Sequence, residues 1–228
     1  MKFIISLIIL NLFVTLSYSQ SSPEDKIGAW YMFDGTHIVS DQISIKTDVQ
    51  LRSYELLDNM NLMFYNLGIN YKLNPKTTAT FAYCFLDIDK SYASNGTPHL
   101  FENRFYEQIC YNHNLGILPI YHRFRLENRF LNYVDKNIVK NRFRYCLGTK
   151  IKLNNCFFVN CSNEIFANLK GDVFTENRFY TAIGINLSKY NNIQLGYLNH
   201  QINGENLHRL QIGIFIKTDY RKLTKVAS

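Results

Sequence analysis

The chain has 228 residues, of which 46% are hydrophobic and 15% aromatic, and its formal net charge is +7. Basic, aromatic-rich proteins that bind nucleic acid gather Lys and Arg on one outer face. Here nine of the ten Arg alternate with Phe, Ile and Leu along their own segments. The charges therefore lie opposite the apolar side chains, and we exclude a nucleic-acid partner.

The first residues have the pattern of a secretion signal. Lys2 precedes an apolar stretch at 3–14, and the small residues Ser17 and Ser19 stand just before an expected cleavage site at Gln20. Removing residues 1–19 leaves 24 Lys and Arg against 18 Asp and Glu, a net charge of +6. We predict a signal peptide at 1–19, an N-terminal segment with a short first strand at 20–40, a β-barrel at 41–219 and a C-terminal tail at 220–228.

Strand-like segments follow one another with no convincing helix between them. Polar and apolar residues alternate over ten or more positions in many of them, which is typical of membrane-barrel strands. No stretch after Gln20 reaches the roughly 18 apolar residues of a spanning helix. The predicted strands are 28–34, 41–53, 60–73, 77–88, 101–113, 119–132, 139–152, 156–168, 174–187, 192–202 and 206–219.

Short connections alternate with longer, polar ones, as expected for hairpins in series. In outer-membrane barrels the short turns face the periplasm and the longer loops face outward. Eleven strands would leave the first and last parallel, whereas bacterial single-chain barrels have an even number. The fold class is therefore all-β, a single-domain antiparallel transmembrane barrel of 10–12 strands. We expect either ten strands, with 28–34 as a short strand or lumen insert, or twelve.

The phrase Glu-Asn-Arg-Phe recurs at 102–105, 127–130 and 176–179, with a fragment at 141–143. Side chains alternate between the two faces of a strand, so each copy places Glu and Arg on one face and Phe on the other. We predict a charged ring in the lumen at the outer mouth, formed by Glu102, Arg104, Glu127, Arg129, Arg142, Glu176 and Arg178. Further predicted lumen-lining residues are Arg52, Arg123, Arg125, Arg144, Glu164 and Arg209.

The alternation also predicts which side chains face outward and how one hairpin pairs. Outward-facing residues should include Phe105, Leu126, Phe130, Ile183, Ile185 and Ile212. A tight turn centred between Leu115 and Gly116 pairs residues whose numbers sum to 231. That register places Glu102 opposite Arg129 and Arg104 opposite Glu127, so that opposite charges face each other.

Some residues stand apart from this pattern. Glu107 has outward parity in mid-strand, which is costly in lipid unless a β-bulge re-aims it or a subunit covers it. Trp30 and the many Tyr are interpreted as membrane-interface belts. The five Cys lack the spacing of a zinc site and are interpreted as small hydrophobic residues, at least one of them unpaired within the chain.

These motifs resemble a family of Gram-negative outer-membrane barrels catalogued as domain of unknown function 2490. The resemblance covers most of the chain after the signal, and its most specific part is the run at 122–130. It implies a signal peptide and an outer-membrane barrel, and it supplies no activity. The matching segments are 28–31, 50–52, 102–104, 122–130 and 208–213.

Three functional interpretations remain open. The preferred one is a narrow passive channel or lumenal binding site for small anionic solutes, since Arg binds carboxylate, phosphate and sulfate through bidentate hydrogen bonds. The first alternative is a structural barrel plugged by its own Arg and Glu. The second is an outer-membrane hydrolase, which the six scattered His and the absence of hydrolase motifs disfavour, so no enzyme is expected. We expect no cofactor or metal. The expected partner is the outer-membrane lipid bilayer, and solute identity and oligomeric state stay open.

Overall fold

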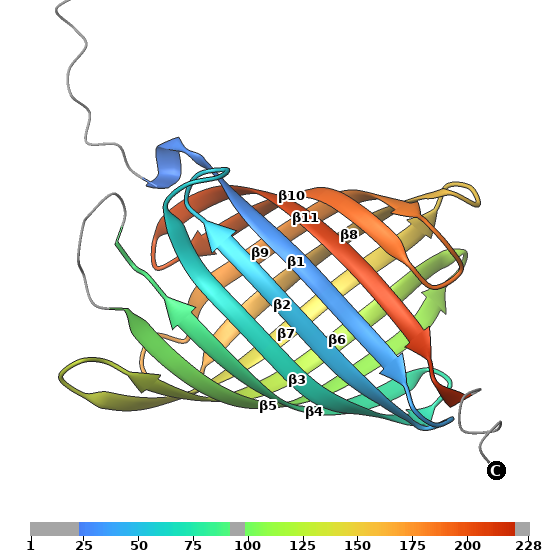
Figure 1. Ribbon diagram of the computed structural model, residues 1–228, viewed down its shortest axis with the longest axis horizontal. Helices are drawn as coiled ribbons and strands as arrows, with labels where there is room; N and C mark the ends of the chain where they lie inside the picture. The colour runs from blue at the N-terminus through green and yellow to red at the C-terminus, as the bar shows by residue number, and fades with distance from the viewer. Residues whose placement is uncertain (1–22, 92–98, 222–228) are drawn as a thin grey trace, which may run out of the picture.

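The computed structural model describes residues 23–91 and 99–221. The predicted signal peptide and most of the predicted tail lie outside these residues. Eleven strands form one closed barrel, preceded by a 3₁₀ turn at Pro23–Asp25 (Figure 1). The strands are β1 Ile27–Ile38, β2 Ile43–Ser53, β3 Met60–Asn74, β4 Thr77–Ile88, β5 Leu100–Leu115, β6 Leu118–Asn132, β7 Asn137–Lys152, β8 Phe157–Asn168, β9 Phe174–Asn186, β10 Asn192–Ile202 and β11 Glu205–Asp219.

The barrel closes through a parallel pair. Neighbours in sequence pair antiparallel from β1 to β11, and β1 then pairs with β11 in parallel, from Ile27 opposite His208 to Ile38 opposite Asp219. The 10–12 strands predicted include this number, but the expectation of an even count was wrong. The first segment is a full strand of 12 residues in the wall, neither a short strand nor a lumen insert.

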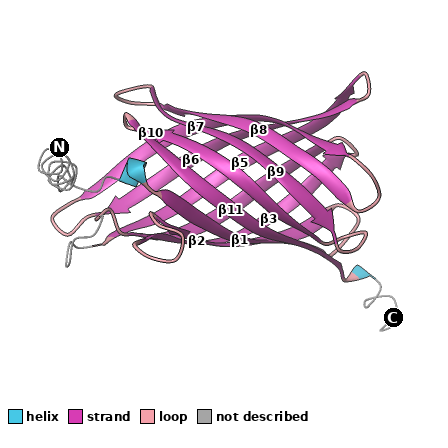
Figure 2. Cartoon of the chain, turned by 90° about the horizontal axis from the view of Figure 1, so that it is seen from above, coloured by secondary structure: helices cyan, strands magenta, loops and turns pink. Residues whose placement is uncertain are grey.

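Because the strand number is odd, the chain enters the barrel at one end and leaves it at the other. The connections after β1, β3, β5, β7 and β9 have two to five residues and lie at one end, which we call the turn end. Those after β2, β4, β6, β8 and β10 lie at the other, the loop end, where the two-residue turn 203–204 accompanies longer connections such as 54–59. β1 begins at the loop end and β11 finishes at the turn end, so the two ends of the described chain lie at opposite ends of the barrel (Figures 1 and 2).

Two tight turns show why the chain reverses where it does. Asn203 and Gly204, between β10 and β11, both have positive φ, 50° and 89°, as a type I′ hairpin turn requires. Between β5 and β6, Gly116 has φ of 60° at the first of two central turn positions, where Gly adopts this conformation without steric cost. These turns fix the registers of their hairpins.

The predicted facing of the strands is confirmed. Phe105, Leu126, Phe130, Ile183 and Ile185 are exposed on the outer wall, and Ile212 is half-buried with the same parity. The residues on the opposite parity are buried among one another inside the barrel. Those predicted inside, all buried or half-buried, are Arg104, Arg125, Arg129, Arg144 and Arg178.

Candidate functional site

Glu127 is the centre of a buried cluster of charges inside the barrel. Its side chain on β6 is 0% exposed. Its carboxylate lies 2.6 Å from Arg142 Nη2, 2.7 Å from Arg144 Nη1, 3.4 Å from Arg104 Nη1 and 3.6 Å from Arg125 Nη1. Four guanidinium groups thus share one carboxylate. They come together because they all lie on the inward faces of β5, β6 and β7.

Glu164 extends the cluster to β8. Its Oε1 accepts hydrogen bonds from Arg123 Nη2 at 2.9 Å and from Arg144 Nε at 3.0 Å. Its Oε2 accepts a further bond from Arg144 Nη2 at 2.8 Å. Arg144 therefore forms a bidentate ion pair with Glu164 through Nε and Nη2 and donates to Glu127 through Nη1. These bonds connect β6, β7 and β8.

Glu176 extends the cluster to β9 and β10. It accepts a hydrogen bond from Arg142 Nη1 at 2.8 Å, and it forms a close ion pair with Arg178. Its Oε1 also lies 2.8 Å from Nε2 of His200. We name the network of Glu102, Glu127, Glu164 and Glu176 with the Arg side chains bonded to them the Arg–Glu cluster.

The predicted register of the β5–β6 hairpin was wrong. The turn places Leu115 opposite Leu118, so paired numbers sum to 233, Arg104 lies opposite Arg129, and Glu102 lies opposite Leu131. The opposite charges meet diagonally instead. Arg129 donates two hydrogen bonds of 2.8 Å to Glu102, whose other neighbour is Arg104 at 2.7 Å. Long side chains reach their diagonal neighbours, so direct opposition is not needed.

The predicted ring is a buried cluster rather than a charged rim. Glu102, like Glu127, is 0% exposed. It is flanked on the neighbouring strands by Leu86 and Leu131, which are directly opposite it. Buried leucines on the inward face also lie on the loop-end side of the charges. These leucines are Leu62, Leu86, Leu100, Leu131 and Leu207.

All thirteen site residues predicted from sequence are found on the inward face, but they do not form one network. Eleven of them belong to the Arg–Glu cluster, whereas Arg52 and Arg209 have no ion pair with a carboxylate among the described residues. Arg52 lies over Trp30, which is 5% exposed and inward-facing, and Arg209 lies over Tyr54. The interface-belt interpretation of Trp30 was wrong, and its parity opposite Tyr31 and Phe33 was the available signal.

His200 is the histidine that contacts the Arg–Glu cluster. His200 hydrogen-bonds Glu176, and within residues 23–91 and 99–221 no serine hydrogen-bonds His200. In the same part of the chain, no group of three or more His, Cys, Asp or Glu is arranged to hold a metal ion. All five Cys are free, with Cys84 and Cys146 buried. The described side chains of the lumen thus form a network of Arg–carboxylate ion pairs that includes His200.

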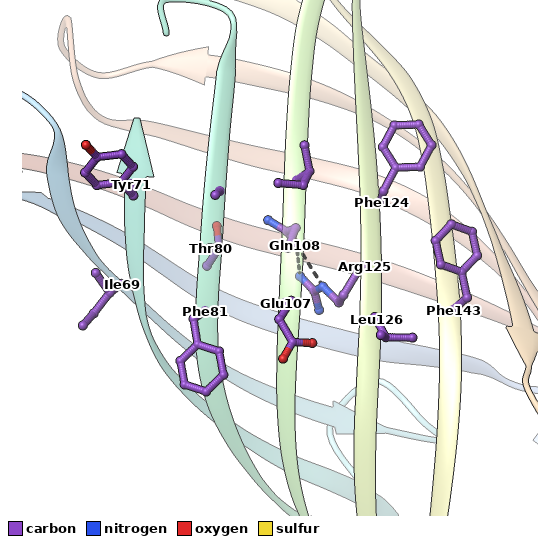
Figure 3. A pocket seen from close by; sticks show the side chains of 12 residues that line it. Ile69, Tyr71, Thr80, Phe81, Glu107, Gln108, Phe124, Arg125, Leu126 and Phe143 are labelled. Carbon is purple, nitrogen blue, oxygen red and sulfur yellow. Dashed lines mark hydrogen bonds between the residues drawn. The ribbon is translucent and has the colours of Figure 1, made fainter. Parts of the chain in front are cut away.

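The outer wall carries an apolar hollow of about 610 Å³ over β3 to β7, around Glu107 (Figure 3). No register shift interrupts β5 in its pairing with β4 or β6, so no bulge re-aims this residue. Its neighbours across the strands are Phe81 and Leu126, and it forms no hydrogen bond or ion pair with another described residue. Behind it, Arg125 donates to Gln108 inside the barrel.

Replacing Glu107 by Leu is expected to stabilise the barrel in a bilayer. The substitution removes a carboxylate from the apolar wall, where a charge is unfavourable, and the gain should reach about 1–2 kcal/mol because acidic residues cost less than basic ones there. Urea unfolding in lipid vesicles measures it. A loss of stability in E107L would instead indicate that the carboxylate has a partner in the assembled protein.

Comparison with protein families identifies the chain. In the part of the chain that the structure describes, no helix has the length and apolar character needed to cross a membrane. The searches of curated proteins and of solved structures gave no match. The model of the family described as protein of unknown function (DUF2490) matches residues 27–211, which run from the first residue of β1 into β11. The chain therefore belongs to this family.

Proposed function

We propose that the protein is an outer-membrane β-barrel whose lumen is closed by its own Arg–Glu cluster. The observation that carries this proposal is the complete burial of Glu102 and Glu127 among Arg side chains of neighbouring strands. Desolvating these groups is costly, and the cost is offset only while each charge keeps its partners. A closed, structurally stabilising interior is therefore better supported than an open anion pore.

The outer-membrane location is supported by the two faces of the wall. Exposed Phe, Ile, Leu and Val side chains cover the outside, whereas the inside holds the charged groups. In water this arrangement would expose the apolar face and bury the ions, the reverse of a soluble barrel. The secretion-signal pattern before Gln20 and the apolar wall both favour a bilayer as the partner.

Purified protein in planar bilayers tests the closed lumen. The proposal predicts no stepwise current at moderate voltage, with an open porin inserted in parallel as the positive control. Stepwise current with a reversal potential that indicates anion preference would contradict closure. In that case, replacing Arg123, Arg125 and Arg144 together by Ser should shift the reversal potential, because these side chains would then line the conducting path.

Lumenal binding of small anionic solutes is the second candidate function. Nine inward Arg face the carboxylates of Asp48 and the four cluster Glu, an excess of four positive charges. The inward Lys46 pairs with Asp34 at 2.5 Å and leaves this excess unchanged. Binding needs no open path, so it is compatible with a lumen closed to ion flow. We propose binding rather than catalysis, since His200 engages a carboxylate and no serine among the described residues.

A further inference from the structure

We propose that Arg52, Arg178 and Arg209 form a binding site for a small dianionic oxyanion of the phosphate or sulfate type. Arg52 on β2 and Arg178 on β9 lie against Trp30 on β1, in the loop-end half of the barrel. Arg209 on β11 lies over Tyr54 and donates to the carbonyl oxygen of Ser53, the residue after Arg52. The inference rests on the second candidate function, lumenal anion binding. It assigns that function to particular residues and to a ligand class.

The ring of Trp30 packs against two of the guanidinium groups of the site. The guanidinium carbon of Arg52 lies 3.6 Å from the centre of the Trp30 rings, and that of Arg178 lies 5.0 Å from it. Trp30 and Arg52 are directly opposite each other on β1 and β2. Gln50 holds both in place, because its Oε1 accepts hydrogen bonds from Trp30 Nε1 at 2.8 Å and from Arg52 Nη2 at 2.6 Å.

The described carboxylates compensate the charges at this site only in part. Among the described residues, neither Arg52 nor Arg209 forms an ion pair with a carboxylate, and Arg178 pairs with Glu176 alone. Glu176 is itself shared with Arg142 and His200. Like charges repel strongly away from bulk water. Two guanidinium charges therefore lack an anion, and a dianion would neutralise both.

Unused hydrogen-bond donors are present at the same place. Arg52 Nε and Arg178 Nε are buried and have no hydrogen-bond partner among residues 23–91 and 99–221. A buried N–H group without an acceptor is unfavourable, and an oxyanion supplies several acceptors at once. Charge-assisted hydrogen bonds from guanidinium to phosphate or sulfate are among the strongest in proteins. The two free donors and the uncompensated charge thus favour the same ligand.

The backbone positions the guanidinium group of Arg209. Nη1 of Arg209 donates to the carbonyl oxygen of Ser53, next to the register shift between Arg52 and Ser53. A Cβ at Gly28 would lie 2.6 Å from that Nη1 and 2.5 Å from the Ser53 oxygen. Only glycine therefore leaves room for the guanidinium here. Bulges that aim a side chain are common beside binding sites.

Trp30 gives a direct readout, since it is the only Trp of the chain. The full-length protein in detergent micelles is titrated with sodium sulfate and sodium phosphate at constant ionic strength, with chloride as the balancing anion. We expect a saturable change in Trp30 fluorescence with either dianion. Replacing Arg52 or Arg209 by Gln should weaken binding by about 10- to 100-fold, the loss expected for one charged hydrogen-bonding group.

The matched control is Lys170→Gln, which removes one positive charge from an exposed loop position at the same end of the barrel and should leave the affinity unchanged. Gly28→Ala keeps all three Arg but displaces Arg209, and it should weaken binding as R209Q does. R209Q, which introduces no clash with the backbone, keeps the test decisive if R52Q does not fold, as judged by circular dichroism.

Three outcomes separate the inference from the function on which it rests. No saturable response to either dianion in the folded protein would overturn both. A response that persists in R52Q, R209Q and G28A would overturn the assignment to these residues and leave lumenal anion binding standing elsewhere. Loss of the response in K170Q as well would indicate a general charge effect and would also overturn the site.

Discussion

Replacing Glu127 by Gln is expected to destabilise the barrel more than any other single change at the cluster. The substitution preserves shape but removes the carboxylate that Arg104, Arg142 and Arg144 share. Breaking a buried ion pair by removing one partner costs about 3–5 kcal/mol, because the remaining charge stays buried. With Arg125, four Arg lose their common partner here, so we expect the free energy of unfolding to fall by at least that amount.

Urea unfolding in lipid vesicles, followed by the fluorescence of Trp30, measures this change. Glu107→Gln is the matched control, because it makes the same chemical change on the outer wall, where Glu107 has no partner among the described residues. It should change stability far less than E127Q. Equal effects in the two variants would contradict the view that the cluster stabilises the closed interior.

Replacing Leu126 by Arg is expected to destabilise the barrel by about 2–4 kcal/mol in a bilayer. Leu126 lies near the middle of β6 and is 40% exposed on the outer wall. In a protein surrounded by water, Arg at such an exposed position would change stability by only about 0.5 kcal/mol in either direction. The size of the effect therefore reports whether lipid or water covers this face.

Val134→Arg is the control for this prediction. Val134 is 79% exposed in the loop between β6 and β7, beyond the wall, and Arg there should cost little. Both variants are compared in vesicles by urea unfolding. A loss for L126R no larger than that for V134R would argue that the middle of the wall is not in contact with lipid.

Strand positions and facing could be predicted because one pattern determines both. Alternation along β4, for example, gives the bounds 77–88 from sequence, and the structure has the same bounds. β1 was predicted to end at Asp34 and was therefore too short. In the structure the strand continues through Gly35 to Ile38, since β2 and β11 supply pairing partners on both sides.

Closure and register could not be predicted from the same pattern. An odd barrel needs only one parallel pair, and the side-chain alternation of β1 does not distinguish a parallel neighbour from an antiparallel one. The β5–β6 register depended on where Gly116 sits within its turn, a conformational preference of one residue. The predicted pairing of Glu102 with Arg129 nevertheless exists, because diagonal contacts tolerate a shift that direct opposition does not.

The sequence also could not predict which Arg residues have a carboxylate partner. Parity places Arg129 and Arg209 on the same inward face, but only the three-dimensional arrangement gives Arg129 a carboxylate and leaves Arg209 bonded to a backbone carbonyl. Such differences arise from contacts between strands distant in sequence, such as β2, β9 and β11 around Trp30. They are the basis of the anion site that we propose.

Membrane fractionation followed by washing with urea tests the central claim most directly, namely that the apolar wall lies against lipid. The account predicts that the protein remains in the outer-membrane pellet after a urea wash that releases peripheral proteins, because extraction would expose the whole apolar face to water. Recovery of the folded protein in the soluble fraction before or after the wash would contradict it.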